Sequence, residues 1–180
     1  MPKVNVFDKF VRVRPKSGRS IVQRELTVAA NQTIRAGDLV KLNSGSVEQL
    51  AALNANANST TAIDGVDLLG VALADITMGA SAEATTGRTK IPVAILDDNV
   101  EVAFRIYNST AGDAEPQDVT IGSAYQAVRW TGNSNSIWWY AATTTTTNGT
   151  FRLVEKSQDS AAGDDYGICW YSVIAADQQG

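Results

Sequence analysis

Apolar and polar side chains alternate with a period of two in much of this sequence, and this pattern constrains the fold most. It is clearest in residues 100–107, where Val100, Val102, Phe104 and Ile106 are separated by Glu101, Ala103 and Arg105. Side chains two residues apart lie on the same face of a strand, so this segment predicts a strand with one buried face. Helical spacing is scarce, and its best example, residues 47–53, spans barely two turns.

Strand-like segments recur along the whole chain, separated by clusters of Gly, Asn, Asp and Ser. The predicted strands are residues 10–14, 21–28, 38–42, 69–75, 91–96, 100–107, 125–130, 137–140, 151–155 and 168–174. The cluster Asp97-Asp98-Asn99 stands between two of them and predicts a hairpin or a tight corner. Many short strands with such turns predict an all-β fold, a sandwich or a barrel of jelly-roll or β-tulip type.

Basic residues are concentrated at the N-terminal end. Residues 1–24 carry a net charge of +6 and residues 25–180 carry −10, which together give the −4 of the whole chain. This asymmetry predicts a basic, extended N-terminal arm, residues 1–24, followed by a β domain, residues 25–180, with possible sub-domains at 25–107 and 117–176. The alternative is a solvated first strand whose basic side chains protect a sheet edge.

The predicted arm also contains Val and Phe residues, which add apolar contact area to its charge. We therefore expect it to dock on another protein, through Lys3, Phe7, Lys9, Phe10, Arg12, Arg14 and Arg19. Nucleic acid is not an expected partner, because the acidic remainder of the chain would repel phosphates.

The residue types needed for common catalytic sites are missing. The sequence has no histidine and a single cysteine, which excludes Ser-His-Asp and Cys-His arrangements and internal disulfides. It also has no GxSxG motif, no phosphate-binding glycine loop and no CxxC motif. Cys169 lies in an apolar run and is predicted to be a buried, unreactive thiol. We expect no enzymatic activity, no catalytic residue, no cofactor and no metal.

The sequence contains two pairs of neighbouring carboxylates that are candidates for an acid–base or calcium site, Asp97-Asp98 and Asp164-Asp165. Adjacent residues on an extended chain point to opposite faces, so neither pair forms an acid–base dyad. Both pairs lie beside turn residues and are predicted to be turn residues themselves. A surface calcium site built from two loops is the alternative.

Tryptophans gather in the C-terminal half, above all in Trp138-Trp139-Tyr140. On a strand, Trp138 and Tyr140 share one face and Trp139 lies on the other. Three interpretations stay open for Trp138 and Trp139: core packing, a protein interface, or a stacking platform for glycans.

The N-terminus has no hydrophobic signal region, and no apolar stretch approaches the length of a membrane span. A soluble protein made in a cytoplasm, with no membrane contact, is therefore expected.

Several motifs occur in an order typical of one family. They are TIRAGDLVKL at 33–42, LGVALADI at 69–76, a small-residue turn at 77–82, and IPVAILDDN and EVAFRIYN at 91–108. Together they resemble the capsid decoration, or cement, proteins of tailed bacteriophages. The resemblance covers residues 25–130, and residues 49–66 and the tryptophan cluster depart from the shortest members.

This resemblance implies a non-enzymatic, head-stabilising protein of the virion. It would bind the major capsid protein on the capsid exterior after synthesis in the host cytoplasm, often as a homotrimer. The alternatives are a glycan-binding or host-adhesion β module that uses Trp138 and Trp139, and another virion component such as a tail or fibre protein.

Overall fold

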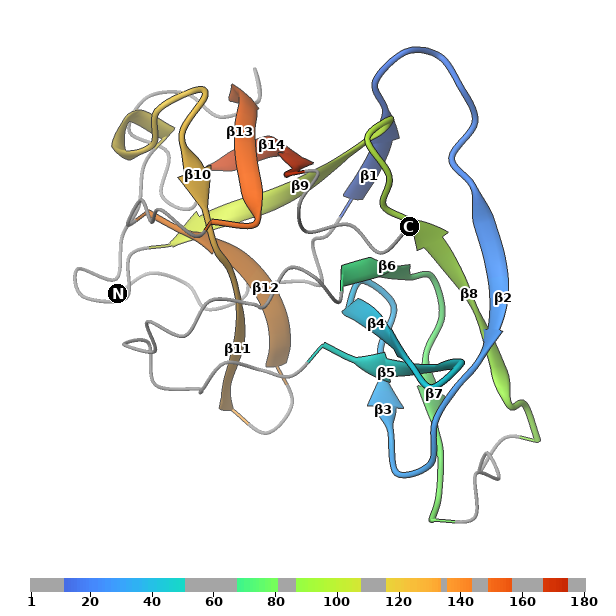
Figure 1. Cartoon of the computed structure of the whole chain (residues 1–180). Coiled ribbons are helices and arrows are strands. Elements are labelled where there is room, and N and C mark those ends of the chain that lie inside the picture. Colours follow the sequence, from blue (N-terminus) through green and yellow to red (C-terminus); the bar gives the residue numbers. More distant parts are fainter. Residues whose placement is uncertain are drawn as a thin grey trace.

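The computed structural model describes residues 12–50, 68–80, 87–107, 116–133, 136–143, 149–156 and 167–174. The prediction of an all-β fold is confirmed: these residues form strands, turns and one short 3-10 helix, Pro116–Asp118. The strands are β1 (Arg12–Pro15), β2 (Gln23–Thr27), β3 (Thr33–Ile34), β4 (Leu39–Asn43), β5 (Ser46–Gln49), β6 (Leu68–Ala72), β7 (Ile76–Thr77), β8 (Lys90–Ile95), β9 (Val100–Tyr107), β10 (Ala124–Tyr125), β11 (Ala127–Asn133), β12 (Ser136–Ala142), β13 (Phe151–Lys156) and β14 (Ile168–Val173) (Figure 1).

Seven strands form a curved sheet, called here the barrel sheet. Their order is β10-β13-β14-β9-β12-β11, with β1 also paired to β9. The strands at the two ends of this order, β10 and β11, are separated only by Gln126 and act as one bent strand. Because β10 pairs with β13 and β11 pairs with β12, the sheet nearly closes on itself. A barrel-like architecture is therefore present, as the turn-rich sequence predicts.

The second sheet has five strands in the order β2-β8-β6-β4-β5. A two-residue turn joins β4 to β5, and its central residues, Ser44 and Gly45, have φ angles of 49° and 83°. Positive φ at both central positions is the signature of a type I′ turn, whose twist matches an antiparallel pair. An isolated bridge between Val28 and Val47 brings the two ends of this sheet together. The five-stranded sheet is therefore also curled, with the short pair β3 and β7 beside it.

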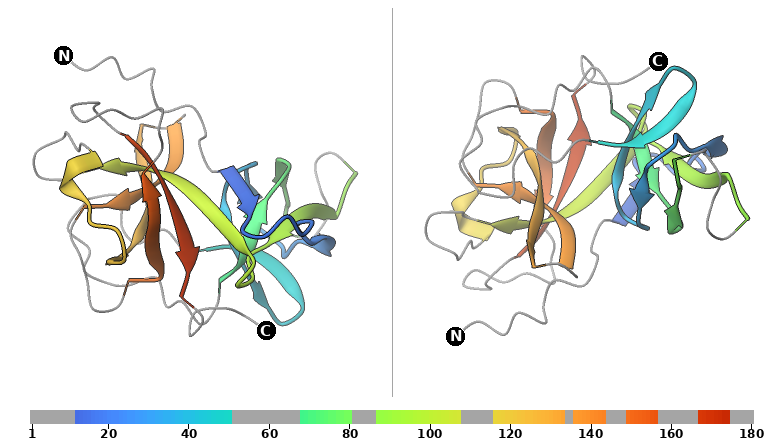
Figure 2. Two further views of the ribbon diagram at one scale, coloured as in Figure 1. Left: turned by 90° about the horizontal axis from the view of Figure 1, so that it is seen from above. Right: turned by 90° about the horizontal axis from the view of Figure 1, so that it is seen from below.

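The two sheets are joined where β8 ends and β9 begins. Asp97 organises this connection, because its carboxylate accepts the N–H of Asn99 at 2.9 Å and its carbonyl accepts the N–H of Val100 at 3.1 Å. Strands β8 and β9 pair with different partners, so the connection is the tight corner and not a hairpin. Figure 2 shows the yellow-to-red strands of the barrel sheet on one side and the five-stranded sheet on the other.

Two clusters of buried side chains fill these sheets. The first lies inside the barrel sheet around Phe104, whose ring meets that of Phe151 edge to face at 4.9 Å between centroids. It extends to Leu39 and Val71 on the five-stranded sheet, so the two sheets pack on a shared core. The second cluster lies within the curl of the five-stranded sheet. Burial of each large apolar side chain contributes roughly 2 kcal/mol to stability.

The described structure differs from the expectations of the sequence at three places. The helical spacing at 47–53 does not give a helix in its described part, because Ser46–Gln49 is strand β5, paired with β4. The boundary between the two sheets falls at the 96–99 corner, so β9 belongs with the C-terminal strands instead of with residues 25–95. Within the predicted arm, Arg12–Pro15 is strand β1 of the barrel sheet and β2 begins at Gln23. The other residues of the predicted arm that precede β1, 1–11, lie outside the described residues.

Candidate docking surface

The residues predicted to contact a partner separate into two groups. Lys3, Phe7, Lys9 and Phe10 lie outside the described residues. Arg12 and Arg14 stand on β1, and Arg19 lies in the connection to β2. Arg12 and Arg19 are exposed, whereas Arg14 is partly buried.

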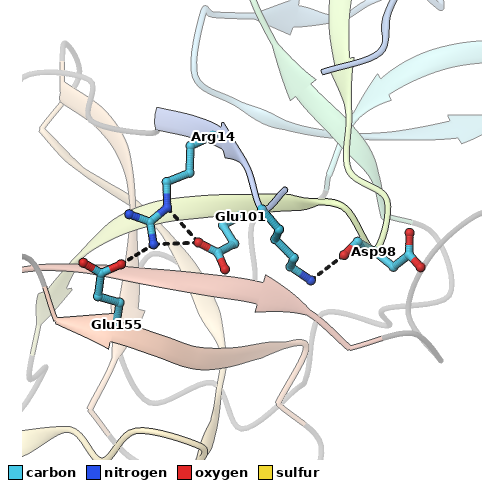
Figure 3. Close-up of polar contacts among 5 residues, drawn as sticks. Arg14, Asp98, Glu101 and Glu155 are labelled. Carbon is cyan, nitrogen blue, oxygen red and sulfur yellow. Dashed lines mark hydrogen bonds and ion pairs between the residues drawn. The ribbon is translucent and has the colours of Figure 1, made fainter. Parts of the chain in front are cut away.

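Arg14 is held by side chains from three other strands. Its Nε donates to Glu101 Oε2 at 2.7 Å and its Nη2 pairs with Glu155 (Figure 3). Its guanidinium also lies 4.1 Å from the ring centroid of Trp170. Burial lowers the pKa of Arg14, but the hydrogen bonds and charges of Glu155 and Glu101 outweigh burial and raise the pKa. We call this group the Arg14 clamp. It ties strand β1 to β9, β13 and β14 within the barrel sheet. The charge of Arg14 is therefore neutralised within the fold.

The chain crosses from β1 to β2 beside the 96–99 corner and is bonded to it. The Lys16 N–H donates to the carbonyl of Asn99 at 2.7 Å, and Lys16 Nζ donates to the carbonyl of Asp98 at 2.5 Å. Ser17 Oγ and Asn99 Oδ1 are 2.7 Å apart. Asp97 and Asp98 therefore act as turn residues here, whereas Asp164 and Asp165 lie outside the described residues.

Arg12, the first residue of β1, lies near Arg105 of β9. Burial lowers the pKa of Arg105, and the charge of Arg12 lowers it further. The two guanidinium groups thus raise the positive potential at this end of the barrel sheet.

Four exposed basic residues belong to β2, β8 and the segments that precede them. Arg19 lies before β2 and Arg24 within it, Arg88 lies before β8, and Lys90 is the first residue of β8, opposite Thr27. We call these four residues the basic edge. None of them forms an ion pair with a described carboxylate, and Glu25 is the one acidic residue within β2. Of these four residues, only Arg19 was among the contact residues predicted from the sequence. Arg88 and Lys90 come near β2 only through the pairing of β2 with β8.

Trp139 lies in the core. Its side chain is 3% exposed, and its Nε1 donates to Asp38 Oδ1 at 3.2 Å. Asp38, also 3% exposed, accepts two further hydrogen bonds at Oδ2, from the N–H of Arg35 at 2.9 Å and from Gln49 Nε2 at 2.6 Å. The aspartate of the AGDLV motif therefore joins the two sheets through Trp139. Trp138 belongs to β12, but its side chain lies outside the described residues.

Cys169 is buried within the barrel sheet, as the sequence predicts. Burial raises the pKa of its thiol to about 11, so little thiolate forms near neutral pH.

Neither a metal-binding cluster among the described residues nor a similarity to known proteins indicates a function. In the described part of the chain, no cluster of three or more metal-ligating side chains occurs, and no helix is long and apolar enough to cross a membrane. No family model matches the sequence, and a search of curated proteins finds no significant match. Function therefore has to follow from the chain's own residues.

Proposed function

We propose that this chain is a non-enzymatic cement protein that binds the outer surface of a tailed-phage capsid and stabilises the mature shell. The observation that carries the proposal is the basic edge, a group of exposed cations without ion-pair partners among the described carboxylates, on a chain of net charge −4. A local concentration of like charges favours a partner surface of opposite sign and speeds its encounter.

The fold is suited to this role. The motifs that resemble those of decoration proteins contribute β3, β4, β6, β7, β8 and β9. They build a rigid frame, in which the buried Asp38 joins the sheets, and the frame leaves the basic edge exposed. A rigid surface binds with a smaller loss of conformational entropy than a flexible one.

Binding that is selective for the mature lattice would stabilise that lattice by mass action. We further propose that the partner is the major capsid protein and that the chain acts as a homotrimer on the capsid exterior. Three linked copies raise the effective concentration of each binding site without any new type of contact.

Burial of Trp139 weakens the glycan-binding alternative, because a ring that is 3% exposed offers no stacking face to a sugar. That alternative now depends on Trp138. A tail or fibre location makes no use of a particular described residue and is tested by locating the protein on particles.

Co-sedimentation with mature phage capsids stripped of decoration protein tests the proposal. The full chain is compared with a chain that lacks residues 1–11, which keeps β1 and the Arg14 clamp, and with the double variant Arg19→Ala, Arg24→Ala. We expect saturable binding by the full chain. The double variant should bind roughly tenfold more weakly, because two interfacial cations are lost.

Arg152→Ala is the matched control, because Arg152 is an exposed cation on the barrel sheet, where Nη1 donates to the carbonyl of Gly122 at 2.8 Å. It should bind like the unaltered chain. Failure of the folded full chain to bind any mature capsid, or binding that is insensitive to salt, would contradict the proposal.

A further inference from the structure

The outer edge of β2 carries backbone groups that point away from the sheet. The Ile95 N–H donates to the carbonyl of Val22, and the Val28 N–H donates to the carbonyl of Thr89, both at 2.9 Å. In an antiparallel pair, residues bonded to the partner alternate with residues whose N–H and C=O face outward. The register of β2 on β8 therefore assigns outward-facing N–H and C=O groups to Gln23, Glu25 and Thr27.

The opposite end of the same sheet is closed. On the outer edge of β5, the carbonyl of Val47 accepts the Ala29 N–H at 2.9 Å, and the N–H of Gln49 donates to Gln32 Oε1 at 3.0 Å. At Gln23 and Glu25, no described residue provides equivalent partners for the outward groups of β2. From Thr27 onward, the Val28–Val47 bridge joins the two ends of the sheet. The edge of β2 is thus open at Gln23 and Glu25 and is covered by β5 beyond them.

The open edge is accessible and positively charged. Gln23, Arg24, Glu25 and Thr27 are all exposed, and the basic edge runs along the same strand. A second copy of the chain is a poor occupant, because symmetric antiparallel pairing centred on β2 would place Glu25 opposite Glu25. Like charges directly opposite each other destabilise a strand pair. An acidic segment, in contrast, would meet Arg24 on β2, with Lys90 on the neighbouring strand, and a single carboxylate, Glu25.

We propose that the outer edge of β2 binds an extended, acidic segment of a partner protein by strand addition. This inference rests on the proposed function, in which the partner is the capsid protein. Backbone hydrogen bonds to Gln23 and Glu25 supply affinity, and the basic edge selects for an acidic sequence.

Proline at position 25 tests the pairing. Glu25→Pro removes one outward N–H and places a ring where the added strand would lie, and it leaves the hydrogen bonds between β2 and β8 in place. We expect Glu25→Pro to remain folded by circular dichroism and to bind mature capsids at least roughly tenfold more weakly in the co-sedimentation assay. The control Glu25→Ala keeps the N–H and removes an unfavourable charge, so it should bind at least as tightly as the unaltered chain.

Hydrogen–deuterium exchange of the unaltered chain, free and capsid-bound, provides the second readout. We expect the β2 segment to gain protection on binding, while β5 is protected in both states. Outward amides of β2 that already exchange slowly in the free chain would show that its own residues cover the edge, which overturns the inference. Normal binding by Glu25→Pro also overturns it and leaves the proposed function standing. If the unaltered chain binds no mature capsid, both fail together.

Discussion

Strands β1 and β2 come from the same basic segment of the sequence, yet they are used differently. On β1, the register and the hydrogen bond from the Lys16 N–H to Asn99 show which backbone groups pair with β9. The N–H and C=O groups of Arg12 and Arg14 point toward β9, and the backbone groups of Val13 and Pro15 point outward. Pro15 has no N–H, so it offers no hydrogen-bond donor to an added strand. The outer edge of β2 has two uncovered residues with both groups outward, Gln23 and Glu25.

The side chains follow the same division. Arg14 is neutralised by Glu101 and Glu155 and stacked on Trp170, whereas Arg24 has no ion-pair partner among the described carboxylates. The arginine of β1 therefore stabilises the fold, whereas the arginine of β2 is available to a binding partner. The surroundings of each strand decide its role.

Proline substitutions at neighbouring positions of β2 should produce the largest contrast. Arg24→Pro removes an N–H that bonds to β8 and should lower the free energy of unfolding by about 3 kcal/mol. Glu25→Pro affects the outward side only and should cost less than about 1 kcal/mol. Urea denaturation of both variants measures this, and equal losses would show that the assigned register is wrong.

Alanine at the two arginines compares the strands directly. Arg14→Ala should destabilise the chain by about 1–2 kcal/mol, because it removes the stacking on Trp170 and leaves Glu101, which is 13% exposed, without its cation. Arg24→Ala should leave the urea midpoint unchanged and weaken capsid binding. The opposite ranking of the two variants in stability would refute the division between β1 and β2.

The two glutamates of the Arg14 clamp should differ in their contributions. Glu101→Gln should cost about 1 kcal/mol and Glu155→Gln about half of that, because the Glu155 side chain is 44% exposed and Glu101 is 13% exposed. A double-mutant cycle of each with Arg14→Ala isolates the pair energies. A larger coupling for Glu155 would show that exposure does not rank these contacts.

The smallest effect is expected at Pro15. Pro15→Ala restores an outward N–H on β1 and should change stability by no more than about 0.5 kcal/mol. Capsid binding should stay the same, because the basic edge lies along β2. Tighter binding by this variant would move the docking edge to β1.

Local patterns in the sequence predicted most strands. The alternation in β9 and the turn cluster at 97–99 both reflect interactions between near neighbours in the chain, and both are found. Strand β5 was missed because Val47 and Leu50 also fit helical spacing over so short a segment. Its pairing with β4 depends on a type I′ turn at Ser44-Gly45, which lacks the usual asparagine.

The candidate docking surface was only partly predictable. The basic charge of residues 1–24 predicted part of the proposed surface, in which Arg19 remains. The Arg14 clamp was not foreseen, because Glu155 and Trp170 follow Arg14 at long separations and meet it only through the pairing of β1, β9, β14 and β13. The open edge of β2 is likewise a property of the sheet order, which a single sequence does not encode locally.

Single-particle electron microscopy of mature capsids incubated with the full chain tests the central claim most directly. We expect density for the chain on the capsid exterior, with an extended segment of the capsid protein lying beside Gln23–Thr27 and acidic side chains near Arg24 and Lys90. Bound molecules whose β2 edge faces solvent, or density confined to the tail, would contradict the account.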